Sequence, residues 1–217
     1  MAVGEANLGD LLPVAGLRLA TVSAGIKKPG RRDLVLMALA SGSHVAGVFT
    51  RNAFCAAPVV VARAHLAASR QQPAYLLVNT GNANAGTGEP GLADAQRCAG
   101  AVAELTGVPT EAVLPFSTGV IGEPLPVQKI VDVLPQALAE LREDGWLDAA
   151  HGIMTTDTRP KACSVRFRAE PCAQRYCQGR RHAAAQHGHH VGLSGHGCGG
   201  KPGIAADPAG RCRGYVV

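Results

Sequence analysis

Three absences narrow the classes of protein to which this 217-residue sequence can belong. No apolar run approaches the roughly 20 residues that a membrane-spanning helix requires, so we expect no membrane span. The opening residues, MAVGEANLGDLL, lack a basic stretch followed by a continuous apolar core, so we expect no secretory signal and a cytoplasmic location. The seven cysteines are odd in number and have no framework spacing, which favours free thiols over disulfides.

The excess of basic residues is confined to one end of the chain. Residues 1–162 hold 13 Lys+Arg and 14 Asp+Glu, a net charge of −1, whereas residues 163–217 hold 8 and 2, a net charge of +6. A basic segment suggests nucleic acid. Between Arg168 and Val217, however, only Tyr176 and Tyr215 stand among the arginines, which is too few for a base-stacking platform. We therefore expect no nucleic-acid partner.

Residues 168–217, called the tail below, also differ from residues 1–167, called the body, in apolar content. A segment poor in core residues cannot offset the entropy of ordering its chain. We therefore expect the tail to be disordered or non-native and the body to be the folded domain. The large apolar residues of the tail are isolated and follow neither a helical nor a strand period: Tyr176, Val191, Leu193, Ile204, Tyr215, Val216 and Val217.

The tail contains a concentration of histidine that raises the alternative of a metal-binding module. Five of the eight histidines lie between His182 and His196, and Cys198 follows two residues later. Imidazole and thiolate groups bind Zn²⁺ and Ni²⁺ even in flexible chains. A selected site typically has paired ligands at finger-like spacing on a segment that folds, and this tail has neither. No metal ligand is assigned.

The body predicts a mixed α/β (α+β) fold. Helical spacing predicts helices over Gly91–Gly107, with Gly107 as the C-cap, and over Val127–Glu143, with a kink or restart at Pro135. Several strands precede the first clear helix, so simple βαβ winding is not favoured. Short apolar segments bounded by Gly, Pro, Asn or charged residues predict strands at Leu17–Ala24, Leu34–Ala40, Val45–Thr50, Pro58–Arg63, Tyr75–Thr80, Val113–Thr118 and Gly152–Thr158.

Three polar stretches of the body carry functional information. VNTGNANAGTG (Val78–Gly88) follows a buried strand and predicts a tight turn whose backbone N–H groups are free to bind an anion or a carbonyl. PFSTGVIGEPLP (Pro115–Pro126) ends a strand with a hydroxyl beside an unhindered backbone N–H, a pair that could stabilise an oxyanion. Each stretch alone is equally compatible with a surface turn or a helix cap.

The third stretch is IMTTDTRPKA (Ile153–Ala162), which combines three threonines with Asp, Arg and Lys. Such a lining suits a substrate that carries both a carboxylate and an amine. The alternative is a polar surface loop.

In this order and spacing, the three stretches resemble the N-terminal half of the ornithine acetyltransferase family, bifunctional enzymes of arginine biosynthesis. LPVAGLRLATVSAGIKKPGRRDLVLMALASGSHVAGVFTRNAFCAAPV (Leu12–Val59) also resembles that family's N-terminus. The resemblance covers about Leu12 to Phe167, and Gly86 stands where many members carry Cys. It implies acetyl transfer from N-acetylornithine to glutamate, with acetyl-CoA as a further candidate acetyl donor, on an ornithine acetyltransferase-like fold.

The resemblance also implies roles for individual residues. Thr118 and Gly119 would stabilise the oxyanion, Thr155 would contact substrate, and Thr156 is a second candidate for that contact. Members of the family cut themselves at an Ala-Thr bond, and the new N-terminal threonine becomes the nucleophile with its own amine as base. The two resulting chains are expected to assemble as an α2β2 heterotetramer. No resident cofactor is implied.

The printed sequence contains neither the Lys-Gly-Ala-Gly nor the Ala-Thr-Met motif of the family. It therefore lacks the nucleophile, and we expect this chain to be inactive. When the codons are read one nucleotide later, Arg175–His182 permit Gly-Ile-Ala-Lys-Gly-Ala-Gly-Met and Gln186–Gly192 permit Asn-Met-Ala-Thr-Met-Leu, with the threonine under His189. We interpret the tail as a frameshifted translation whose frame changes between Phe167 and Arg175.

Overall fold

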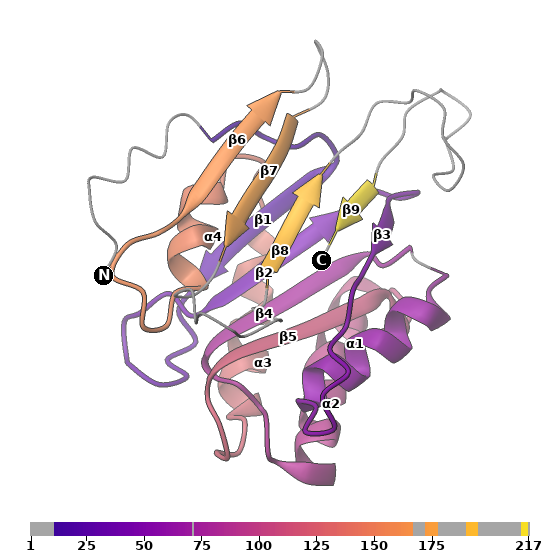
Figure 1. Ribbon diagram of the computed structural model, residues 1–217, viewed down its shortest axis with the longest axis vertical. Coiled ribbons are helices and arrows are strands. Elements are labelled where there is room, and N and C mark those ends of the chain that lie inside the picture. The colour runs from indigo at the N-terminus through magenta and orange to yellow at the C-terminus, as the bar shows by residue number, and fades with distance from the viewer. Residues whose placement is uncertain (1–10, 71, 167–171, 178–189, 195–213, 217) are drawn as a thin grey trace.

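A computed structural model describes residues 11–70, 72–166, 172–177, 190–194 and 214–216 (Figure 1). The body contains a four-stranded mixed sheet in the order β1-β2-β4-β5. The strands β1 (Leu17–Val22), β2 (Leu34–Leu39) and β4 (Tyr75–Asn82) are antiparallel neighbours, and β5 (Val113–Val120) lies parallel to β4. The predicted strands at these four positions and the mixed α/β class are confirmed.

Both faces of this sheet are covered, which explains why β2 reads LVLMAL without a polar alternation. All six residues of β2 are buried. Leu36 belongs to the apolar cluster formed with α2 (Gly88–Thr106) and α3 (Val127–Ala139). Met37 belongs to the cluster formed with α1 (Ala57–Ala68) and α4 (Trp146–Gly152). The predicted C-cap of α2 is confirmed, since Gly107 adopts the left-handed conformation at φ 72°.

The segment Pro58–Arg63, which was predicted as a strand, is instead part of helix α1. Its run of three valines favours a strand locally. The longer segment has apolar residues every three to four positions, and Ala57, Val61 and Leu66 are all buried. Pro58 lies in the first turn, where its missing N–H costs nothing. Packing of the apolar stripe therefore overrides the β-branched preference.

The helix predicted over Val127–Glu143 is present as α3, but it ends at Ala139 and continues through Pro135. The chain leaves the helix because the segment that follows pairs with the open edge of β1. The Leu19 N–H donates to the Arg142 carbonyl at 2.8 Å, and the Arg142 N–H donates to the Leu19 carbonyl at 3.1 Å. This short bridge covers part of an edge strand that would otherwise expose unpaired backbone groups.

Two other predicted strands differ in the structure. Gly152–Thr158 is not a strand, because Gly152 closes helix α4 and the following residues form turns. The strand predicted over Val45–Thr50 is shortened to β3 (His44–Ala46). Among the described residues, β3 pairs with the three-residue strand β9 (Gly214–Val216). A three-residue 3₁₀ turn, Thr110–Ala112, leads into β5.

A second sheet has the order β3-β9-β8-β7-β6 (Figure 1). It contains β6 (Ala162–Arg166), β7 (Cys172–Cys177) and β8 (His190–Ser194). Three short strands thus occur in the tail, where no strand period was predicted, because backbone ladders do not require an apolar pattern. The other tail residues, and the prediction made for them, lie outside the described residues.

No helix in the described part of the chain combines the length and the apolar character needed to cross a membrane.

Candidate active site at the ends of two parallel strands

The two predicted oxyanion residues lie at the carboxyl end of β5, beside the end of β4. In the parallel register, Thr118 pairs with Thr80 and Gly119 pairs with Gly81. Because both strands run in the same direction, the polar stretches that follow them emerge at one edge of the sheet. The structure therefore brings together the first two of the three stretches that were singled out in the sequence.

Gly119 is required at its position by close backbone packing. Its φ is 137°, and a Cβ added there would lie 2.3 Å from the Gly81 carbonyl carbon and 2.6 Å from the Asn82 nitrogen. No other residue type fits without moving one of the two strands. Gly119 is exposed, while Thr118 is partly buried. An exposed backbone with no side chain in front of it is suited to donating its N–H to a bound anion.

Three asparagines of the first stretch are buried, although the sequence predicted a turn with free backbone N–H groups. Asn79, Asn82 and Asn84 are 4%, 3% and 0% exposed. The Asn84 N–H donates to Asn82 Oδ1 at 2.7 Å, and the Ala83 N–H donates to the Val120 carbonyl at 2.8 Å. These two N–H groups are consumed inside the protein, so that part of the anion-binding prediction is wrong. A buried polar group without a hydrogen-bond partner is costly. The polar groups of this turn therefore bond to one another and to the neighbouring strand.

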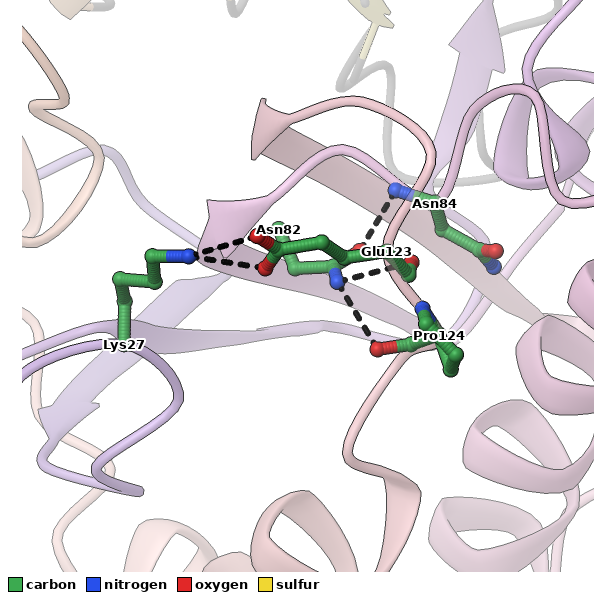
Figure 2. Close-up of polar contacts among 5 residues, drawn as sticks. All are labelled: Lys27, Asn82, Asn84, Glu123 and Pro124. Atoms are coloured by element: carbon green, nitrogen blue, oxygen red, sulfur yellow. Dashed lines mark hydrogen bonds and ion pairs between the residues drawn. The ribbon is translucent and has the colours of Figure 1, made fainter.

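The Asn82 side chain joins the two polar stretches, as Figure 2 shows. Its Nδ2 donates to the Glu123 carbonyl at 3.1 Å and to the Pro124 carbonyl at 3.0 Å. Asn79 acts on the strands themselves, because its Oδ1 accepts the Ser117 hydroxyl at 2.5 Å and its Nδ2 donates to the Asn82 carbonyl at 2.9 Å. The asparagine density of the motif was visible in the sequence, but these partners were not.

The third stretch, which contains Thr155 and Thr156, follows helix α4 as a loop. The Thr80 hydroxyl donates to the Gly152 carbonyl at 2.7 Å, and the Arg31 guanidinium donates to the Met154 carbonyl. Thr80 is also the register partner of Thr118. One buried residue of β4 therefore contacts the start of this loop and pairs with the oxyanion residue. Thr155 is partly buried and Thr156 is exposed.

The charges near these residues are largely paired within the protein. Lys27 and Glu123 form an ion pair at 2.8 Å with about half of each side chain exposed (Figure 2). Asp157 is 2% exposed and pairs with Lys161, and its second oxygen, Oδ2, has no partner within the described residues. The loop at 153–162 is thus not a plain solvated surface turn, since it carries a buried carboxylate.

The structure also identifies a polar cavity that none of the predicted site residues lines. It has a volume of about 420 Å³ and lies against the free edge of β1. Arg32 and Arg142 both pair with Asp148 at its wall. The residues that line it are Thr21, Arg32, Glu140, Arg142, Gly145 and Asp148.

No cysteine in the core is a candidate nucleophile. Burial raises the pKa of the Cys98 thiol from 9.0 to about 12, and Asp94 raises it further while Arg97 lowers it. Cys98 lies in the packed interior against α3. In the part of the chain that the structure describes, no three His, Cys, Asp or Glu side chains are placed to hold a metal ion. The histidine cluster of the tail, from which the metal-binding alternative was drawn, has no described side chains.

Known proteins are similar to this chain in sequence. The ArgJ family model matches residues 18–178. The arginine biosynthesis bifunctional protein ArgJ of Pseudomonas fluorescens is 60% identical over 167 residues, which are 77% of this chain and 40% of that protein. The protein of the same name from Methylococcus capsulatus is 60% identical over 159 residues, 72% of this chain and 38% of that protein. The chain thus spans about two fifths of the length of these relatives.

Solved structures show the same similarity. Ornithine acetyltransferase from Mycobacterium tuberculosis, solved in complex with ornithine, matches with a TM-score of 0.73 and 35% identity over 79% of this chain and 92% of that chain. The arginine biosynthesis bifunctional protein ArgJ from Bacillus halodurans matches with a TM-score of 0.65 and 27% identity over 82% of this chain and 92% of that chain. On the family match and these similarities, the chain belongs to the ArgJ family.

Proposed function

We propose that this chain supplies the oxyanion-stabilising part of an acetyltransferase that moves an acetyl group from N-acetylornithine to glutamate. Acetyl-CoA is an alternative donor in the same reaction class. The observation that carries the proposal is the pairing of Thr118 with Thr80, whose hydroxyl also contacts the start of the Thr155 loop. The names of the relatives and the ornithine bound in the Mycobacterium tuberculosis structure support the substrate class.

In this proposal the residues act on the acetyl carbonyl. Attack on that carbon by a nucleophile opens the C=O bond and places negative charge on its oxygen. The Thr118 hydroxyl and the Gly119 N–H donate hydrogen bonds to that oxygen, which stabilises the tetrahedral intermediate relative to the ground state. Collapse of the intermediate breaks the C–N bond, and the ornithine amine leaves with the proton that the nucleophile gave up. The glutamate amine then attacks the acetylated nucleophile, the same two donors stabilise the second tetrahedral intermediate, and its collapse releases N-acetylglutamate and returns a proton to the nucleophile. Thr155, with Thr156 beside it, contacts the part of the substrate that does not react.

We further propose that the chain alone is inactive, because its printed sequence holds no N-terminal threonine nucleophile. The body, residues 1–167, then acts as the N-terminal part of the acetyltransferase, and the tail is a frameshifted translation. In support, the curated relatives align over 159 to 167 residues and the family match ends at residue 178. Sequencing of the coding DNA across codons 160–217 tests this. Recovery of Lys-Gly-Ala-Gly-Met and Asn-Met-Ala-Thr-Met in the next frame is expected; their absence would rule the frameshift out.

Complementation tests the catalytic proposal. The full chain is mixed or co-expressed with the part of the Pseudomonas fluorescens relative that lies beyond the aligned segment, beginning at its nucleophilic threonine. N-acetylornithine and glutamate are added, and N-acetylglutamate is measured. We expect turnover from the mixture and none from either polypeptide alone. Association into a complex with turnover that Thr118→Val does not reduce would contradict the role of Thr118, and a complex without turnover would contradict the proposed function.

A further inference from the structure

We propose that Asn82 is a positioning residue for the oxyanion pair. Its buried amide would hold the segment after Gly119 so that the Gly119 N–H keeps its direction toward the reacting acetyl group. This inference rests on the proposed function, since it assigns a role relative to that site. Asn82 itself would not touch the substrate, because only 3% of it is exposed.

The pairing between β4 and β5 becomes irregular at Asn82, next to the oxyanion pair. From Tyr75 to Gly81, β4 and β5 pair residue for residue. At Asn82 the register becomes irregular, and this residue pairs with both Thr118 and Val120. Such a bulge bends the strand and disturbs the ladder where it occurs, and the ladder continues beyond it with one bond, from the Ala83 N–H to the Val120 carbonyl. The backbone after Gly119 therefore needs another support.

That support comes from side-chain and backbone bonds on the two sides of the bulge. Asn82 Nδ2 reaches the Glu123 and Pro124 carbonyls at 3.1 and 3.0 Å (Figure 2). The Ala83 N–H donates to the Val120 carbonyl at 2.8 Å, and the Gly122 N–H donates to the Ala85 carbonyl at 2.8 Å. The Asn82 amide is the one side-chain member of this set, and both of its N–H donors are used on the segment that leaves Gly119.

Asn82 is in turn held from its other end. Its Oδ1 accepts the Asn84 N–H at 2.7 Å, and its own carbonyl accepts the Asn79 side chain at 2.9 Å. Every polar group of its side chain thus has a partner, which fixes the orientation of the amide. A fully satisfied buried network has one low-energy arrangement, so it specifies a conformation as well as adding stability.

Asn84 offers a matched control, because it is equally buried but acts elsewhere. Its Nδ2 donates to the Gly91 carbonyl at 2.8 Å, and its Oδ1 accepts the Thr87 hydroxyl at 2.8 Å. Both partners lie at the start of α2, not in the segment that follows Gly119. Truncation of either asparagine removes the hydrogen bonds of a buried amide, and Asn84→Ala also places an alanine at a φ of 44°, so its loss of stability should be at least as large as that of Asn82→Ala. Only truncation of Asn82 should increase the mobility of the segment that follows Gly119.

The first experiment uses the full chain alone and requires no activity. Amide hydrogen exchange is measured by ¹⁵N NMR for the wild type, Asn82→Ala and Asn84→Ala. We expect exchange of the Gly122 amide, which is hydrogen-bonded to the Ala85 carbonyl within Gly119–Glu123, to become about tenfold faster in Asn82→Ala. In Asn84→Ala the increase should instead fall on Thr87–Gly91. If Asn82→Ala does not fold, Asn82→Ser replaces it, since its uncharged hydroxyl retains an acceptor for the Asn84 N–H and lacks the amide N–H donors to the Glu123 and Pro124 carbonyls.

The second experiment uses the complemented enzyme described above. A misdirected oxyanion donor affects the transition state more than the bound substrate. We therefore expect Asn82→Ala to lower kcat on the order of tenfold with KM unchanged within about twofold. Asn84→Ala should leave kcat within about twofold of the wild type at a temperature well below its Tm. Asn82→Ser should resemble Asn82→Ala, because both lack the two amide N–H donors.

The possible results separate this inference from the proposed function. Equal exchange at Gly119–Glu123 in the two alanine variants, or equal losses of kcat, would reduce Asn82 to an ordinary structural residue and overturn the inference. If the wild-type mixture forms a complex but shows no turnover, the proposed acetyl transfer fails. The exchange pattern then still decides whether Asn82 controls the segment after Gly119.

Discussion

Gly119 lies against Gly81 so closely that a Cβ on Gly119 would stand 2.3 Å from the Gly81 carbonyl carbon and 2.6 Å from its oxygen. The contact joins the ends of two parallel strands in one register pair. It combines a left-handed φ of 137° with a lack of space, so both conformation and packing exclude a side chain. The candidate oxyanion site therefore depends on a residue that contributes only backbone.

Substitution of this glycine should damage the sheet end locally. We expect Gly119→Ala to lower the free energy of unfolding by about 2 to 4 kcal/mol, because strand β5 must move away from β4. Chemical denaturation of the purified chain measures the loss. Gly100→Ala is the control, since Gly100 lies inside α2 with nothing within 4 Å of an added Cβ. It should be neutral or stabilise by up to about 1 kcal/mol, and an equal loss in both variants would contradict the steric argument.

Thr80 should be more important than an ordinary buried threonine. Thr80→Val removes the hydroxyl that donates to the Gly152 carbonyl at 2.7 Å and leaves that carbonyl without this partner. We expect a loss of about 1 to 3 kcal/mol, together with faster proteolysis of the loop at 153–162. Thr106→Val is the matched control, because the Thr106 hydroxyl bonds the Val102 carbonyl within its own helix. That change should cost clearly less; similar costs would contradict a special role for Thr80.

Asp33 should hold the loop that carries Lys27. Its two oxygens accept the Ala24 N–H at 2.7 Å and the Ile26 N–H at 2.6 Å, and it is 2% exposed. Asp33→Asn turns one acceptor into a donor that faces a backbone N–H, so we expect a loss of about 2 to 3 kcal/mol.

Denaturation curves of Asp33→Asn and of the exposed control Asp132→Asn measure this effect. Asp132 accepts a hydrogen bond only from Gln128 on its own helix, and its substitution should cost less than about 0.5 kcal/mol. If Asp33→Asn were as stable as this control, the backbone hydrogen bonds to Asp33 would not support the loop.

Alkaline pH should destabilise the chain through Cys98. Its folded pKa, about 12, lies above the unfolded value of 9.0, so the folded state retains the proton where the unfolded state loses it. Above pH 9, ionisation of the thiol therefore stabilises the unfolded state relative to the folded state. The free energy of unfolding falls from this cause by up to about 1.4 kcal/mol per pH unit, until the folded thiol also ionises.

The measurement compares the free energy of unfolding at pH 8 and pH 10 for the wild type and Cys98→Ala. The alanine variant should show a shallower decrease, because it lacks the titrating group. Alkylation followed by mass spectrometry gives a second check: the exposed Cys163 should react rapidly in the native chain, whereas Cys98 should react only after unfolding. Identical pH slopes would contradict the assigned cause.

Short-range pattern was enough to predict much of the sheet. The strands at Leu17–Val22 and Leu34–Leu39 follow from apolar runs between turn residues, and Gly107 was predicted as a helix cap from its place after the last apolar position. The strand predicted from local pattern at Pro58–Arg63 was wrong. Three adjacent valines favour a strand locally, whereas the longer apolar stripe packs as a helix. The prediction from local pattern also failed after Ala139, because the pairing of Arg142 with Leu19 joins residues distant in sequence.

The sequence by itself determined the family and the residue types of the candidate site, because the Ser-Thr-Gly, Asn-Thr-Gly-Asn and Thr-Thr-Asp motifs carry their chemistry in residue identity and order. The tertiary structure decided how these motifs are joined. Thr80 meets the Gly152 carbonyl, and Asn82 reaches the carbonyls of Glu123 and Pro124, only once β4 and β5 lie in parallel register. Such contacts link residues tens of positions apart, and a local pattern does not encode them.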